Sequence, residues 1–218
     1  MSKEFTKSAT SLVTKSYGST STISKEDARQ GRYELHSYLC VGVIRFAGLT
    51  DIDWSTKVIK KIELTLKHGA SGRYDGTEKT FQFWPSNYQV SNDTSKKGSE
   101  FISGRSVLGS VAKGCKRNTN VTITLPADGQ TLFNNMVSYL KSGAVNTFCL
   151  YINESLSGEY TANYLQVTEA SIYIEYEDAV VYFGVDGAWK PCLVFFGQDG
   201  AWKQTIPYFG VDGTWKQV

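Results

Sequence analysis

Residues 58–67 read VIKKIELTLK, and over most of this stretch apolar and polar side chains alternate. In an extended chain Ile62, Leu64 and Leu66 fall on one face, and the charged and hydroxyl side chains between them fall on the other. A period of two predicts a β-strand with one buried face and one face in water.

The same pattern recurs along the chain. The alternating stretches are residues 79–84, 121–125, 147–152 and 169–177, and an apolar run typical of a buried strand spans residues 38–46. Several short strands separated by loops predict an all-β fold, with two sheets packed as a sandwich over residues 31–178. The side chains expected to face inward are Ile62, Leu64, Leu66, Ile123, Phe148, Leu150, Ile172 and Ile174.

One short helix is expected among the strands. It follows Pro126, and Asp128 is predicted to cap it, because an aspartate accepts hydrogen bonds from the first free amides of a helix. The apolar face of this helix comprises Leu132, Phe133, Met136, Val137 and Leu140.

Residues 1–30, by contrast, are rich in Ser, Thr and Lys with little periodicity, and they are predicted to be an arm, either flexible or docked on a neighbouring subunit.

Composition argues against several classes of function. The 218-residue chain has a formal net charge of +2, whereas a dedicated nucleic-acid binder needs a concentrated basic surface to neutralise phosphates. The N-terminus has no apolar stretch long enough for a signal peptide, and the longest apolar-rich run, residues 38–49, is too short to span a bilayer. We therefore expect synthesis in a cytoplasm, no membrane insertion and no nucleic-acid partner.

Patterns of catalytic and metal-binding residues are missing from the sequence. No serine lies in a nucleophile elbow, no Gly-rich loop opens a helix, and the four cysteines have no partners at metal-ligand spacing. The cysteines are expected to be reduced, with Cys40 and Cys149 in the core. Asp51 and Asp53 allow a Ca²⁺ site or an Asp-rich turn, and the turn is the simpler interpretation. A non-enzymatic protein without metal or cofactor is predicted.

The order of these elements resembles a known family. The strands VGVIRFAGL, KIELTL and FQFWP precede the strand NVTITLP, which leads into the helix TLFNNMVSYL, and the strands NTFCLYI and ASIYIEYED follow. Over residues 35–178 this order resembles the jelly-roll carbohydrate-binding module of the disaggregatase-related (DNRLRE) type. The resemblance implies a jelly roll with a binding role and no reaction. Aromatic residues in or beside loops could then line a glycan cleft or pack at its rim; those singled out are Trp84, Tyr88 and Tyr160.

The sequence changes character after Asp178. Residues 179–218 hold three copies of one unit, in which Phe183, Phe196 and Phe209 recur every thirteen residues. An Asp-Gly pair between β-favouring residues predicts a two-residue hairpin turn, here at 186–187, 199–200 and 212–213. Such a turn places a Trp opposite a Gly in each copy, where the ring can fold over the bare backbone; the tryptophans are Trp189, Trp202 and Trp215.

The repeats resemble the C-terminal repeats of bacteriophage tail and baseplate proteins, matched at residues 182–190, 195–203 and 208–216. This resemblance implies a virion structural or adhesion protein that binds an envelope glycan or another virion protein. Its candidate ligand-binding residues are Tyr182, Trp189, Trp202, Tyr208 and Trp215. The alternatives are that these aromatics only pack against each other, and that the chain is a free carbohydrate-binding module of a bacterial surface protein. The arm and the unpaired strand edges of the repeats predict a homo-oligomer, with a trimer as the expected state.

Overall fold

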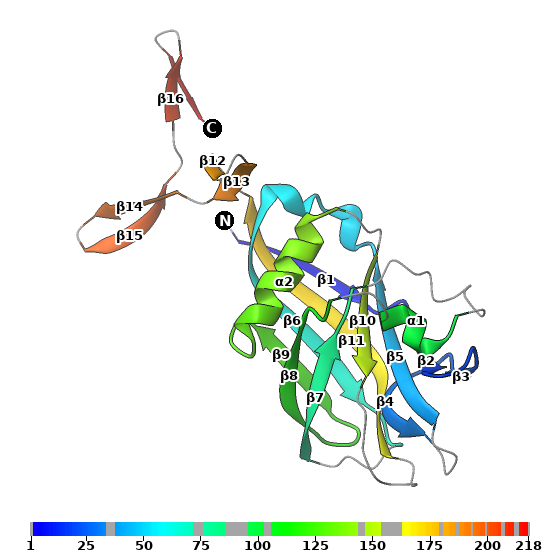
Figure 1. Cartoon of the computed structure of the whole chain (residues 1–218). Coiled ribbons are helices and arrows are strands. Elements are labelled where there is room, and N and C mark those ends of the chain that lie inside the picture. The colour runs from blue at the N-terminus through cyan, green and yellow to red at the C-terminus, as the bar shows by residue number, and fades with distance from the viewer. Residues whose placement is uncertain are drawn as a thin grey trace.

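The computed structural model describes most of the chain. The described residues are 2–33, 38–71, 76–85, 96–102, 106–143, 147–153, 163–178, 181–185, 188–192, 194–198, 200–205, 208–211 and 214–217. Antiparallel strands dominate this part, and its longest helix is α2 (Gln130–Lys141). The predicted all-β fold is therefore confirmed, with strands packed in layers (Figure 1).

The longest strand, β11 (Asn163–Asp178), organises the first layer. Along one edge it pairs with β6 (Lys57–His68), which in turn pairs with β9 (Asn120–Leu125). Along the other edge it pairs first with β4 (Ala28–Tyr33) and then with β1 (Lys3–Ser8). Two short strands therefore follow one another along one edge of a single long strand.

The second layer is built on β5 (Tyr38–Ala47), which pairs with β10 (Thr147–Asn153) and with β2 (Ser11–Ser16). Strand β4 pairs with β5 as well as with β11, so it joins the two layers. The short β3 (Thr22–Ser24) pairs with β2. A separate ribbon of β7 (Thr77–Phe83) and β8 (Gly109–Cys115) contacts β10 through β7 and β9 through β8.

The main core lies between these layers. Seven of the eight side chains expected to face inward are at most 1% exposed, which confirms the alternation; they are Ile62, Leu64, Leu66, Ile123, Leu150, Ile172 and Ile174. The side chain of the eighth, Phe148, lies outside the described residues. The same cluster includes Phe46 of β5 and Phe81 of β7, so side chains from both layers meet in it. Cys40 and Cys149 are fully buried, as expected, and neither forms a disulfide bond with another described residue.

A second, smaller cluster covers the other face of β5. Val41 and Val43 of β5 pack there with Trp84 and with Phe101 of the short helix α1 (Gly98–Ile102). Strand β5 is therefore buried on both faces, because its even-numbered apolar residues Ile44 and Phe46 face the main core. This explains why its sequence is a continuous apolar run rather than an alternating one.

Helix α2 forms where the sequence predicts it, but its start differs from the expectation. The residue before it is Gly129, and no side chain caps the helix. Asp128 instead accepts a hydrogen bond from the backbone N–H of Thr124 at 2.7 Å and forms an ion pair with Lys113 at 2.8 Å. The apolar face was predicted correctly: Leu132, Met136 and Leu140 are buried, and Phe133 and Val137 are half-buried against the core.

The predicted N-terminal arm is wrong, because its residues form strands of the two layers. Strand β1 pairs with β11 from Lys3 opposite Tyr176 to Ser8 opposite Ser171, and β2 pairs with β5. Lys3 and Lys57 both donate to Asp178 at the end of β11, and these hydrogen bonds lower the pKa of Asp178 to about 2. The alternation of β1 is hidden in the sequence because most of its side chains are exposed and polar.

A buried carboxylate ties this N-terminal segment to β11. Asp27 is 4% exposed and receives two hydrogen bonds of 2.9 Å from Arg29 and one of 2.5 Å from Gln166. Thr14 of β2 donates to the Asp27 backbone carbonyl at 2.7 Å. Burial alone would raise the pKa of Asp27, but the hydrogen bonds from Arg29, Gln166 and Ser24 together outweigh it and hold the pKa below its ordinary value.

Replacing this carboxylate should destabilise the sandwich. We expect Asp27→Asn to lower the free energy of unfolding at pH 7 by about 1–3 kcal/mol, because an amide NH₂ would face the donors of Arg29 and Gln166. Glu26→Gln is the matched control, since Glu26 is exposed, and it should change stability by less than about 0.5 kcal/mol. Urea denaturation of both variants measures the difference.

The pH dependence follows from the direction of the shift. Because the pKa of Asp27 is lowered in the folded state, its stabilising effect is complete above the ordinary pKa of 3.8 and is lost as the pH falls through the folded value. The difference between the native protein and Asp27→Asn should therefore shrink below pH 3.8. A difference that stays constant down to pH 2 would contradict this assignment of Asp27.

Candidate functional site

The repeats form three hairpins, each a two-stranded sheet of its own. They are β12 (Val181–Val185) with β13 (Ala188–Cys192), β14 (Val194–Gln198) with β15 (Ala201–Thr205), and β16 (Tyr208–Val211) with β17 (Thr214–Gln217). Figure 1 shows the second and third hairpins standing away from the sandwich and from each other. Among the described residues, no strand of one hairpin pairs with a strand of another. Within the described residues the three units are therefore not joined into one sheet.

The register inside the hairpins agrees with the prediction. Gly184 is paired with Trp189, Gly197 with Trp202, and Gly210 with Trp215. Of the six predicted turn residues, Gly200 lies within the described part of the chain, and its φ of 75° is in the left-handed region. A residue without Cβ adopts this conformation readily, which is the reason for a glycine at this place in the turn.

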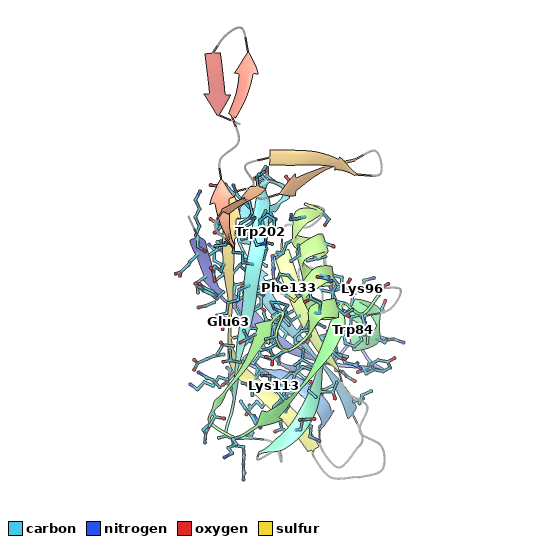
Figure 2. All side chains as sticks on the ribbon, turned by 90° about the vertical axis from the view of Figure 1, so that its left-hand side faces the viewer. Glu63, Trp84, Lys96, Lys113, Phe133 and Trp202 are labelled. Carbon is cyan, nitrogen blue, oxygen red and sulfur yellow. The ribbon has the colours of Figure 1, made fainter. Side chains whose placement is uncertain are left out.

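Trp202 lies on β15 of the second hairpin (Figure 2). A Cβ atom added at Gly197 would lie 3.5 Å from Cζ3 of Trp202, so the indole ring covers the glycine backbone as expected. The ring is nevertheless 78% exposed, and Phe195 on the neighbouring strand is 47% exposed. A broad aromatic surface in water is available for contact with the apolar C–H face of a sugar or with another protein.

At one register position the first unit differs from the other two. Phe195 is paired with Gln204 and Tyr208 with Gln217, whereas Tyr182 is paired with Pro191. A proline has no N–H and no polar side chain, so the first unit lacks the amide that the other two carry. Strand β13 of this unit also contacts β6 of the sandwich. The second and third units are therefore the better candidates for binding.

Among the candidate residues of the sandwich, Trp84 is the one that lies within the described residues. Trp84 is only 7% exposed and packs with Phe101, so its predicted role in a glycan cleft is wrong. The cause is α1, which covers this face of the second layer. Tyr88 and Tyr160 lie outside the described residues. The strands of the other repeats contain Tyr182, Trp189, Tyr208 and Trp215, and the surroundings of these side chains also lie outside the described residues.

The two aspartates for which the sequence allowed a Ca²⁺ site or an Asp-rich turn have structural partners. Asp53 accepts a hydrogen bond from the backbone N–H of Ser55 at 3.1 Å and caps the short helix η2 (Trp54–Thr56), while Asp51 forms an ion pair with Lys7 at 3.1 Å. The described residues contain no group of three or more His, Cys, Asp or Glu side chains arranged to hold a metal ion. No helix in the described ranges is both long and apolar enough to cross a membrane.

Sequence reasoning missed a hollow on the outer face of the first layer. It has a volume of about 330 Å³ and is lined by Ser8, Ala9, Leu12, Thr65, Lys67, Asn120, Thr168, Glu169, Ala170 and Ser171. These residues come from five strands and their connections, which are distant in sequence. The only sequence signal was the run of polar side chains on the solvated faces of residues 58–67 and 169–177.

Comparison with protein-family models gave no match for this chain, and comparison with curated proteins gave none either. What the chain does must therefore be inferred from its own residues.

The turn glycine offers a test of the hairpins. We expect Gly200→Val to open the second hairpin, because the left-handed conformation costs an L-residue about 1–2 kcal/mol and a β-branched residue more. Ala201→Val is the matched control, because Ala201 is exposed and lies in a strand, where valine is favoured.

Cross-strand nuclear Overhauser effects between β14 and β15 measure the outcome in the full chain. They should disappear in Gly200→Val and persist in Ala201→Val. Equal retention in both variants would contradict the requirement for a residue with positive φ at Gly200.

Proposed function

We propose that this chain is a non-enzymatic attachment protein of a bacteriophage virion, a component of the tail, baseplate or head surface. The sandwich is the folded body, and the repeats make contact with a host-envelope glycan or a neighbouring virion protein. One observation carries the proposal: Trp202 is 78% exposed in a hairpin that pairs with no other strand of the described chain.

Exposure of this kind argues for a partner. A two-stranded hairpin alone is marginally stable in water, so an apolar surface that finds no cover within its own chain is typical of a contact site. Repetition of the unit every thirteen residues supports the same role. Several weak sites joined in one chain bind a repetitive surface far more tightly than one site does.

The resemblance of the repeats to phage tail and baseplate proteins supports a virion location. A glycan partner is favoured by the combination of an aromatic ring and an amide in the second and third units, since the ring can stack on a sugar and Gln204 or Gln217 can bond its hydroxyls. Oligomerisation to a trimer would multiply the number of hairpins presented to such a surface.

Loss of the aromatic rings of the repeats should weaken attachment without unfolding the protein. We expect Trp202→Ala to weaken binding of the full chain to host cells and purified cell-wall sacculi by about tenfold, and Trp202→Ala with Trp215→Ala to weaken it further. The matched control is Tyr17→Ala, which removes a 39% exposed aromatic ring from the sandwich. Sedimentation of bound protein measures attachment, and urea denaturation checks that stability is unchanged.

Removal of residues 179–218 provides a second readout. The shortened chain should stay soluble and lose attachment to sacculi and to the virion. If it attaches to either as well as the intact chain does, the repeats are not the contact module for that partner.

A further inference from the structure

The hollow on the sandwich exists because two strands meet end to end along β11. Strand β4 pairs with residues 163–167 and β1 with residues 171–176. Between these segments the register of β11 with β6 shifts from Val167 to Glu169, so Thr168 bulges out of the ladder. The chain leaves β1 at this point, held by a hydrogen bond of 2.8 Å from the Ala9 N–H to the Ala170 carbonyl. An irregular sheet of this kind leaves a depression where a regular one would be flat.

The lining side chains stand in matched rows across neighbouring strands. In one row Glu169 is paired with Lys67, and Lys67 with Asn120. In the next row Ser8 is paired with Ser171, which is paired with Thr65. Because partners in register lie on the same face of a sheet, these side chains converge on the hollow.

The lining has polar groups available for a ligand and a small apolar floor. The side chains of Ser8, Ser171 and Asn120 form no hydrogen bond with other described residues. Ala9, Leu12 and Ala170 supply the apolar surface. Lys67 and Glu169 form an ion pair at 2.5 Å, and they are the only charged residues of the lining, which is therefore neutral overall.

This chemistry selects among classes of ligand. An anion would have to take Lys67 from its carboxylate partner, and a cation would find one carboxylate where divalent ions require several oxygen ligands. Neither β6 nor β11 can accept an added peptide strand, because each of them is paired along both edges. A sugar ring carries hydroxyl groups around its rim and C–H bonds on its faces, which complements hydroxyl, amide and paired charged groups around an apolar floor.

We propose that this hollow, between β1, β6, β9 and β11, is a binding site for one or two rings of a neutral saccharide. Its volume of about 330 Å³ is at the small end of the range for ligand sites, which suits a short segment rather than a long chain. The site uses no residue of the repeats, so it is independent of the attachment role proposed for them.

The test is a titration of the full chain, followed by ¹H–¹⁵N nuclear magnetic resonance. The probes are D-glucose, D-galactose, L-rhamnose and N-acetyl-D-glucosamine, with inorganic phosphate as an anionic comparison. We expect saturable shifts from at least one sugar at the amides of Ala9, Asn120 and Thr168 to Ser171, and none from phosphate. The absence of saturable shifts with every sugar, or saturable shifts at these amides with phosphate, would overturn the assignment.

Two variants and one control locate the site. Ser171→Tyr places a ring in the hollow at a strand position that tolerates it, and it should abolish the shifts. Asn120→Ala removes the free amide of an exposed residue and should weaken binding about tenfold. The control Ser110→Tyr makes the same exchange at an exposed position of β8 and should leave binding unchanged.

The combined Trp202→Ala and Trp215→Ala variant separates this proposal from the role of the repeats. Sugar-induced shifts that survive in this variant and disappear in Ser171→Tyr support the hollow as the site. The opposite pattern would assign the sugar to the repeats, which would overturn the present inference and leave the proposed function standing.

Discussion

The backbone hydrogen bonds along both edges of β11 hold the first layer together. The strand is sixteen residues long, pairs with β6 over residues 167–178, and pairs with β4 and β1 on its other edge. Its alternate side chains Ile172 and Ile174 enter the core with no exposed surface. The strand also holds the N-terminal strand in place, because Lys3 of β1 donates a hydrogen bond to Asp178 at the end of β11. Lys57 of β6 donates to the same carboxylate. Strand β11 therefore contributes to the sheet, to the core and to the attachment of the N-terminal strand.

The arrangement around β11 also explains the irregular part of its surface. A long strand whose partner edge is filled by two short strands must have a junction between them, and the bulge at Thr168 lies beside that junction. Buried polar groups stabilise the same region, because Gln166 of β11 donates to Asp27 and its carbonyl approaches Nδ1 of His68 at 3.1 Å. A depression supported by a fixed network can keep its shape without a ligand, which lowers the cost of binding one.

The repeats are stabilised by local contacts, whereas the sandwich is stabilised by contacts between distant segments. The second hairpin is stabilised locally, by the turn conformation that Gly200 adopts and by the indole ring of Trp202 over the facing Gly197. None of these contacts requires the rest of the fold, so the units can be repeated without redesign of the sandwich. This arrangement leaves an aromatic surface exposed to water, and a binding partner can bury that surface. The sandwich, whose core is built from segments distant in sequence, therefore carries hairpins that fold locally.

Local patterns in the sequence determined the strands and the hairpins. The alternation of Ile62, Leu64 and Leu66 predicted a buried face because period two is a property of the extended backbone itself. The pairing of Gly197 with Trp202 followed from the length and residues of the turn. Helix α2 was also predicted from its apolar face, although the partners of Asp128 were not, because Lys113 lies on another element.

Tertiary structure alone decided the features that depend on distant segments. Residues 2–33 joined the sheets because the edges of β11 and β5 needed partners, which no local pattern in a polar segment reveals. Trp84 was buried because α1 packs over it. The hollow brings Ser8, Thr65, Asn120 and Ser171 together from four strands. Sequence periodicity reports which face of a strand is buried, whereas neighbours across a sheet are set by long-range pairing.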